Sequence, residues 1–172
     1  MQKRQPAWRI RVPEDTYELT DIIQGPFSQC LAKDCGDFVV KRSDGLFAYQ
    51  LATVVDDAEQ GVNMIVRGMD LLVSTPQQMY LQDMLGCKHV RYAHVPLLVG
   101  ELDRRLSKRD KDAGIDELIT RFKTPEGVIG HIAFITGLID VDEPASCEDL
   151  LSSFDSSRLP SMFPDKIQIL WH

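Results

Sequence analysis

The chain has 172 residues, of which 44% are hydrophobic, so it can form one domain or one domain with a small appendage. Its sequence has no apolar run of about 18 residues, and its basic start lacks the apolar stretch of a signal peptide. A formal net charge of −7 argues against a general nucleic-acid binder. We therefore expect a cytoplasmic protein that does not contact membranes.

One basic patch stands out in this acidic chain. It comprises Arg104, Arg105, Lys108, Arg109 and Lys111, whereas acidic residues collect between residues 140 and 155. Because charge is segregated along the chain, the basic patch is a candidate site for phosphate groups.

The cysteines and histidines form no recognisable metal-binding pattern. Cys30 and Cys35 are close in sequence, but neither a second cysteine pair nor a nearby histidine accompanies them. No HExxH, Walker lysine loop, GxGxxG or GxSxG motif is present. We expect free thiols and no zinc site in this chain.

The first half of the chain has the pattern of alternating strands and helices. Alternating apolar residues predict a strand over residues 8–12, and a second strand is predicted over residues 38–41, in a hairpin with residues 46–49. A helix is predicted over residues 50–59, followed by a β-branched strand over residues 62–66.

A βαβ unit is predicted next. Ser74 begins a helix with a hydroxyl cap, Gly86 ends it, and a further strand is predicted over residues 95–99. Such units build parallel sheets, whose ligands bind beyond the carboxyl ends of the strands. Arg67 and the loop of residues 100–109 should therefore lie on the same face.

The second half is predicted to be helical. Apolar residues at helical spacing predict a helix over residues 115–122. Thr124 begins another helix, which Gly137 ends, and Ser146 with Asp149 resembles the capping box of a third.

The loop Leu106-Ser107-Lys108-Arg109 is the first candidate for chemistry. A loop with a lysine and a small hydroxyl residue can wrap a polyphosphate, and the lysine can stabilise negative charge that develops on the phosphates. The structural alternative is a solvated basic turn.

Arg67 and Tyr49 are the other candidates. Arg67 follows a buried strand and is suited to hold a carboxylate through two hydrogen bonds, or it forms a structural salt bridge with Asp56, Asp57 or Asp70. Tyr49 either packs in the core or presents its phenol to a small polar substrate. Adjacent aspartates diverge on a helix, so Asp56 and Asp57 are not expected to hold one ion.

In chain order, these segments resemble the class I glutamyl-tRNA synthetases, and most closely their shortened relatives, the glutamyl-Q tRNA(Asp) synthetases. Together they cover roughly residues 7–110, and the ordered set is specific although each segment is short. The matching segments are residues 37–52, 54–57, 60–61, 66–72, 74–78, 92–98 and 105–109.

This resemblance implies an α/β fold. Residues 1–110 would form the second half of a Rossmann-like parallel-sheet catalytic domain that ends in the signature loop. Residues 111–172 would form a helical segment like the one that contacts the tRNA stem in this family.

The resemblance also implies a reaction. The glutamate carboxylate attacks the α-phosphate of ATP, which enters with Mg²⁺, and the resulting glutamyl group moves to tRNA(Asp), at queuosine, or to tRNA(Glu). By position, Tyr49 and Arg67 would bind glutamate, and Arg67 would pair with its side-chain carboxylate. Lys108 would be catalytic. Leu106, Ser107 and Lys108 would bind ATP within the signature loop, which runs from Arg105 to Arg109.

Three parts of the family pattern are absent from this sequence: the HIGH-like first signature, the N-terminal residues that complete glutamate binding, and a cysteine-rich zinc insertion. We therefore expect a fragment, an excised domain or a split gene product that is inactive alone. Its open sheet edge would be covered by the missing half or by a second copy. The alternatives are a fragment of a true glutamyl-tRNA synthetase and a non-catalytic paralogue that binds nucleotide or protein.

Overall fold

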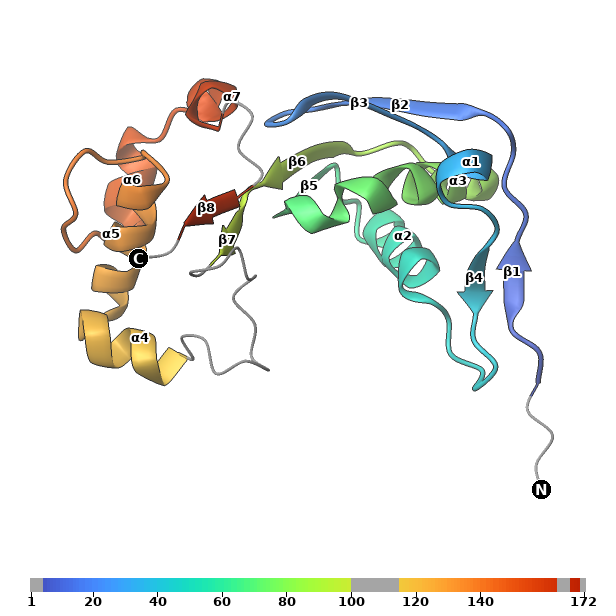
Figure 1. Ribbon diagram of the computed structural model, residues 1–172, viewed down its shortest axis with the longest axis horizontal. Coiled ribbons are helices and arrows are strands. Elements are labelled where there is room, and N and C mark those ends of the chain that lie inside the picture. The colour runs from blue at the N-terminus through green and yellow to red at the C-terminus, as the bar shows by residue number, and fades with distance from the viewer. Residues whose placement is uncertain (1–4, 100–114, 164–167, 171–172) are drawn as a thin grey trace. The chain divides into compact units, whose positions relative to one another are not determined.

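The structure is a computed structural model that describes residues 5–99, 115–163 and 168–170 (Figure 1). The chain divides into two compact units, Met1–His94 and Val95–His172, called here the N-terminal and the C-terminal unit. In the described ranges, no helix combines the length and the apolar character that a membrane crossing requires.

The N-terminal unit alternates short strands and helices. Its elements are β1 (Trp8–Ile10), β2 (Thr16–Asp21), β3 (Gly25–Cys30), α1 (Leu31–Asp34), β4 (Phe38–Lys41), α2 (Tyr49–Glu59), β5 (Met64–Gly68), the 3-10 helix η1 (Met69–Ser74), α3 (Thr75–Leu85) and β6 (Arg91–Val95), which ends at the unit boundary.

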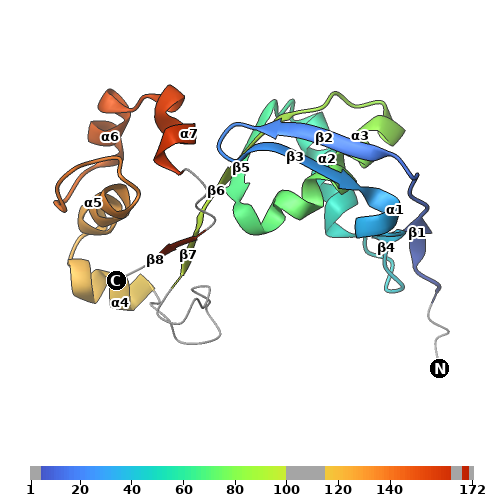
Figure 2. The ribbon, with the colours of Figure 1, turned by 45° about the horizontal axis from the view of Figure 1, so that its top comes forward.

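The β2–β3 hairpin and α3 organise the N-terminal unit. The two strands pair antiparallel from Thr16 opposite Cys30 to Asp21 opposite Gly25, whose φ of 78° suits glycine at the turn. The hairpin runs along α3, and α2 packs against α3 (Figures 1 and 2). The core between these elements includes Leu31 and Leu81, which are buried.

The C-terminal unit is mainly helical, as the sequence predicts. Its elements are β7 (Leu97–Val99), α4 (Ile115–Phe122), α5 (Pro125–Ile135), α6 (Cys147–Ser153), the 3-10 helix η3 (Ser156–Arg158), α7 (Leu159–Met162) and β8 (Gln168–Leu170). β7 and β8 pair in parallel.

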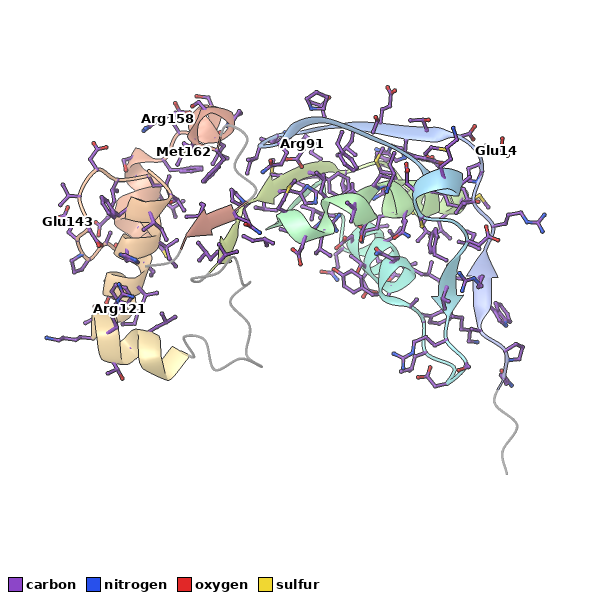
Figure 3. The ribbon with its side chains drawn as sticks, in the orientation of Figure 1. Glu14, Arg91, Arg121, Glu143, Arg158 and Met162 are labelled. Carbon is purple, nitrogen blue, oxygen red and sulfur yellow. The ribbon has the colours of Figure 1, made fainter. Side chains whose placement is uncertain are left out.

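The predicted signals at the helix ends of the C-terminal unit are confirmed. Thr124 Oγ1 accepts a hydrogen bond of 3.1 Å from the backbone N–H of Gly127 at the start of α5. Ser146 and Asp149 form the full capping box of α6. After α5 the chain turns back along that helix in a loop that carries Glu143 (Figure 3).

Two predictions about strands need correction. The strand that pairs with β5 is β6, and the strand predicted over residues 95–99 is confined to β7. Pro96 separates β6 from β7 because proline has no backbone N–H to donate to a strand partner. The expected hairpin of residues 38–41 with 46–49 is reduced to a single bridge between Lys41 and Phe47, and β4 pairs with β1 instead.

The predicted α/β class is confirmed. Its strands form four two-stranded sheets within the described residues. The division of the chain at residue 110 stays a prediction, because residues 100–114 lie outside the described ranges.

Candidate functional site

Arg67 lies near the carboxyl end of β5, and its guanidinium is held by four protein acceptors. Nε donates to His94 Nε2 over 3.0 Å, and Nη1 donates to Gln78 Oε1 over 2.7 Å. Nη2 donates to Thr75 Oγ1 over 2.7 Å and to the Leu71 carbonyl over 3.3 Å. A guanidinium has five N–H groups, so these contacts leave one N–H of Nη1 for a ligand, and the expected two hydrogen bonds to a carboxylate are reduced to one.

Among the described residues, the guanidinium has no direct anionic partner. Within the described ranges, no carboxylate lies at ion-pair distance from Arg67, so the expected alternative of a structural salt bridge with Asp56, Asp57 or Asp70 is wrong. Burial lowers the pKa of Arg67 from its usual value, and the nearby Tyr92, Tyr49 and Asp57 oppose this shift. Such a half-buried cation is suited to a ligand that supplies a negative charge.

A buried aspartate and histidine stand behind the guanidinium. Asp21 Oδ2 and His94 Nδ1 are 2.6 Å apart, and both side chains are fully buried. Burial acts to raise the pKa of Asp21, but hydrogen bonds from the His94 side chain and from the backbone N–H groups of Gln24, His94 and Ile23 outweigh it and lower that pKa. The carboxylate therefore stays ionised in the interior.

A side chain at the start of α3 accepts a hydrogen bond from Arg67. The predicted hydroxyl cap is wrong: Ser74 is the N-cap residue, but its side chain makes no capping hydrogen bond. The neighbouring Thr75 hydroxyl instead accepts from Arg67 and lies 3.3 Å from the Leu71 carbonyl. The first residue of α3 therefore helps to hold the Arg67 guanidinium in place.

Tyr49 begins α2 and is accessible. Its side chain is 58% exposed, so the alternative of core packing is wrong and the phenol is free to meet a ligand. The next residue, Gln50, accepts a hydrogen bond of 2.7 Å from Gln78 Nε2, and Gln78 in turn accepts from Arg67. A continuous hydrogen-bonded path therefore joins Arg67 to the start of α2.

The predicted ATP-binding loop lies outside the described residues. Its members are Arg105, Leu106, Ser107, Lys108 and Arg109. In the described ranges, no group of three or more His, Cys, Asp or Glu residues could hold a metal ion.

Asp21, His94 and Gln78 were not singled out as site residues from the sequence. Their contacts with Arg67 or with each other join residues 11 to 73 positions apart, which no local pattern reveals. A separate cavity of about 520 Å³ is lined by the end of α2, the turn before β5, Gln82 of α3 and residues 87–90, and neither Arg67 nor Tyr49 lines it.

A family model described as tRNA synthetases class I (E and Q), catalytic domain, matches residues 1–129. The chain belongs to this family of class I aminoacyl-tRNA synthetases. Among solved structures, a glutamate tRNA ligase from Elizabethkingia meningosepticum, in complex with its amino acid, matches with a TM-score of 0.72 and 26% identity. That match covers 87% of this chain and 34% of the ligase.

The curated relatives carry a more specific name. A glutamyl-Q tRNA(Asp) synthetase from Neisseria meningitidis is 54% identical over 116 residues, which cover 67% of this chain and 39% of the relative. A protein of the same name from Symbiobacterium thermophilum is 42% identical over 155 residues, which cover 90% of this chain and 48% of the relative. The chain thus spans less than half the length of these relatives.

Proposed function

We propose that this chain supplies part of the active site of an enzyme that activates glutamate with ATP and transfers the glutamyl group to tRNA. The observation that carries the proposal is Arg67, a half-buried cation with one N–H to spare and no carboxylate partner in the described part of the chain. Its position suits the side-chain carboxylate of glutamate, with the accessible Tyr49 as a second contact.

The proposed reaction has two steps. An oxygen of the glutamate α-carboxylate bonds to the α-phosphorus of ATP, the bond to the bridging oxygen breaks, and pyrophosphate leaves with that electron pair. A hydroxyl of the RNA acceptor then attacks the acyl carbon, its proton is lost, and AMP departs. Arg67 orients glutamate for both steps, and Lys108 stabilises the phosphate charge that grows in the first.

The acceptor that we favour is queuosine in tRNA(Asp). The support is that relatives named glutamyl-Q tRNA(Asp) synthetase are 42–56% identical over the residues they match, whereas the glutamate tRNA ligase of known structure is 26% identical. Aminoacylation of tRNA(Glu) is the alternative. A transfer assay with both tRNAs, the tRNA(Asp) with and without queuosine, separates the two.

The test uses a hybrid enzyme, defined as this chain joined to the portion of the Neisseria meningitidis relative that it does not match. We expect glutamate-dependent ATP–pyrophosphate exchange from the hybrid. Arg67→Ala should raise the glutamate KM by about tenfold or more, since a charged hydrogen bond is lost, with a smaller effect on the KM for ATP.

Tyr49→Phe is the matched second variant, because it removes one exposed hydroxyl and no packing. It should raise the glutamate KM by a smaller factor and leave the melting temperature unchanged. An unchanged glutamate KM in Arg67→Ala would remove Arg67 from the site. A hybrid that folds but lacks exchange would favour the non-catalytic paralogue.

A further inference from the structure

The buried pair Asp21 and His94 lies directly behind the guanidinium that we assign to glutamate binding. Asp21 is 2% exposed and His94 is completely buried. Asp21 Oδ1 accepts from the backbone N–H groups of Ile23, Gln24 and His94 over 2.9–3.0 Å, so the carboxylate is anchored at the end of β2. Its other oxygen is left for the imidazole of His94, 2.6 Å away on β6.

Hydrogen-bond direction fixes the state of the imidazole. Arg67 Nε carries one hydrogen and can only donate, so His94 Nε2, 3.0 Å away, must accept. The single proton of the neutral ring then sits on Nδ1, where it donates to Asp21. The order of donation therefore runs from Arg67 to His94 to Asp21, and each link requires the one before it.

We propose that Asp21 and His94 are positioning residues that set the Arg67 guanidinium for the side-chain carboxylate of glutamate, an inference that rests on the proposed function. The imidazole separates the two charges, so Asp21 supports the cation without forming the direct ion pair that would compete with a substrate. The groups that face the Asp21–His94 pair are the Arg67 guanidinium, the Tyr92 ring and the Thr75 hydroxyl. The Tyr92 ring stacks on the His94 ring with 6.0 Å between the ring centres.

This arrangement explains why the guanidinium keeps one direction. His94, Gln78 and Thr75 fix all three nitrogens of Arg67. A guanidinium fixed at Nε has lost rotation about its last bond, so the remaining N–H of Nη1 points to one place. Preorganised donors of this kind bind a carboxylate without the cost of ordering a long side chain.

The first test changes one atom of Asp21. In Asp21→Asn the side-chain oxygen can keep the backbone N–H groups, and the new NH₂ then faces His94 Nδ1. Because this NH₂ group donates, His94 Nδ1 must accept, and the ring proton moves to Nε2. There it points at the N–H of Arg67 Nε, so the hydrogen bond between the two residues is lost. Nitrogen-15 NMR of the purified 172-residue chain should show the Nδ1–H tautomer of His94 in the wild type and the Nε2–H tautomer in the variant.

The Arg67 Nε–H signal gives a second readout, because it should exchange slowly with water in the wild type and quickly in Asp21→Asn. Asp142→Asn is the matched control, since Asp142 Oδ2 lies 2.9 Å from His131 Nδ1 in the C-terminal unit and should leave His94 unchanged. A wild-type ring that carries its proton on Nε2, or an unchanged tautomer in Asp21→Asn, would overturn the proposal.

A pair of His94 variants separates positioning from packing. Gln places an amide oxygen near the site of Nε2 and can still accept from Arg67, whereas Asn can still donate to Asp21 but leaves Arg67 Nε without an acceptor. In the hybrid enzyme, His94→Asn should raise the glutamate KM by about tenfold with little change in the ATP KM, and His94→Gln by less than about threefold. Equal losses in both variants would indicate a merely structural role.

The two ideas fail in different ways. A folded hybrid without ATP–pyrophosphate exchange would refute the proposed function. The His94 tautomer and the rate of hydrogen exchange at Arg67 Nε, both measured by NMR, would still decide whether Asp21 and His94 hold the guanidinium. If the hybrid enzyme catalyses ATP–pyrophosphate exchange and its glutamate KM is unaltered in both Asp21→Asn and His94→Asn, only the positioning role is refuted.

Discussion

Gln78 takes its orientation from Arg67. Because the guanidinium only donates, Gln78 must turn its oxygen toward Nη1, and its NH₂ group then faces Gln50 Oε1 at 2.7 Å. The NH₂ group of Gln50, beside Tyr49, is consequently directed away from this contact. One arginine thus sets the polarity of side chains on two different helices.

Gln78→Glu should weaken glutamate binding. Gln78 is 1% exposed, so the new carboxylate would be buried 2.7 Å from Nη1 and would pair with Arg67 in place of the substrate. We expect the glutamate KM of the hybrid enzyme to rise by about tenfold or more. Gln77→Glu is the matched control: Gln77 precedes Gln78 on the same helix but donates to Cys35 Sγ and not to the Arg67 network, so it should leave that KM unchanged.

Tyr17 predicts a loss of stability at high pH. Burial and a hydrogen bond of 3.1 Å to Asp83 raise its pKa from 10.0 to about 12. Between pH 10 and 12 the unfolded chain therefore releases this proton while the folded chain retains it, so stability falls as pH rises through this window. Denaturation melts should show the fall in the wild type and a smaller one in Tyr17→Phe; an equal fall in both would contradict it.

The sequence predicted the residue types of the candidate site but not its support. Arg67 was found from its place after a strand and Tyr49 from the family resemblance, because both signals are local. The partners of Arg67 depend on the close approach of the end of β2 to β6, where the Ile22 N–H donates to the Tyr92 carbonyl and Asp21 meets His94 across 73 residues. Only the assembled fold makes that contact, so the salt bridge to a sequence neighbour was the natural but wrong alternative.

At the scale of elements, local signals explain what was predicted correctly. Helix ends carry their own residues, such as Thr124 at the start of α5 and Gly86, with φ of 69°, at the end of α3. The β2–β3 hairpin was missed because its second strand opens with Gly25-Pro26, which predicts a turn. The alternation of half-buried Tyr17 and Leu19 in β2 was the available signal.

At Gly130, helix α5 packs so closely on the loop that follows it that a side chain would not fit. A Cβ at this position would lie 1.8 Å from the carbonyl oxygen of Glu143 and 2.9 Å from the Ala145 nitrogen. Gly130→Ala must therefore displace the loop and strain the Ala145 to Glu126 backbone hydrogen bond of 3.0 Å. We expect a loss of about 1–3 kcal/mol, measured by denaturant unfolding, with helix content retained. An unchanged unfolding midpoint would show that the loop moves freely.

At the scale of the whole molecule, β5 leaves apolar side chains uncovered. Val66 is 62% exposed and Met64 is 37% exposed, although both lie on the strand that presents Arg67. Exposed apolar side chains that gather on one strand mark a surface that another segment or protein normally covers. We therefore propose that further catalytic-domain sequence, of the kind that makes the curated relatives more than twice as long as the part they share with this chain, covers β5 in the active enzyme.

This proposal predicts that activity depends on assembly. The 172-residue chain alone should give no glutamate-dependent ATP–pyrophosphate exchange, whereas the hybrid enzyme should give it, because the hybrid covers β5 and completes the site around Arg67.

In the hybrid, Lys108→Ala should lower kcat for exchange by about 10²–10³-fold, as expected when one preorganised charge is removed from a phosphoryl-transfer site. Lys111→Ala, in the same basic segment but outside the signature loop, is the matched control and should retain most of the activity. Exchange by the chain alone would refute the need for assembly, and wild-type exchange in Lys108→Ala would remove that lysine from the reaction.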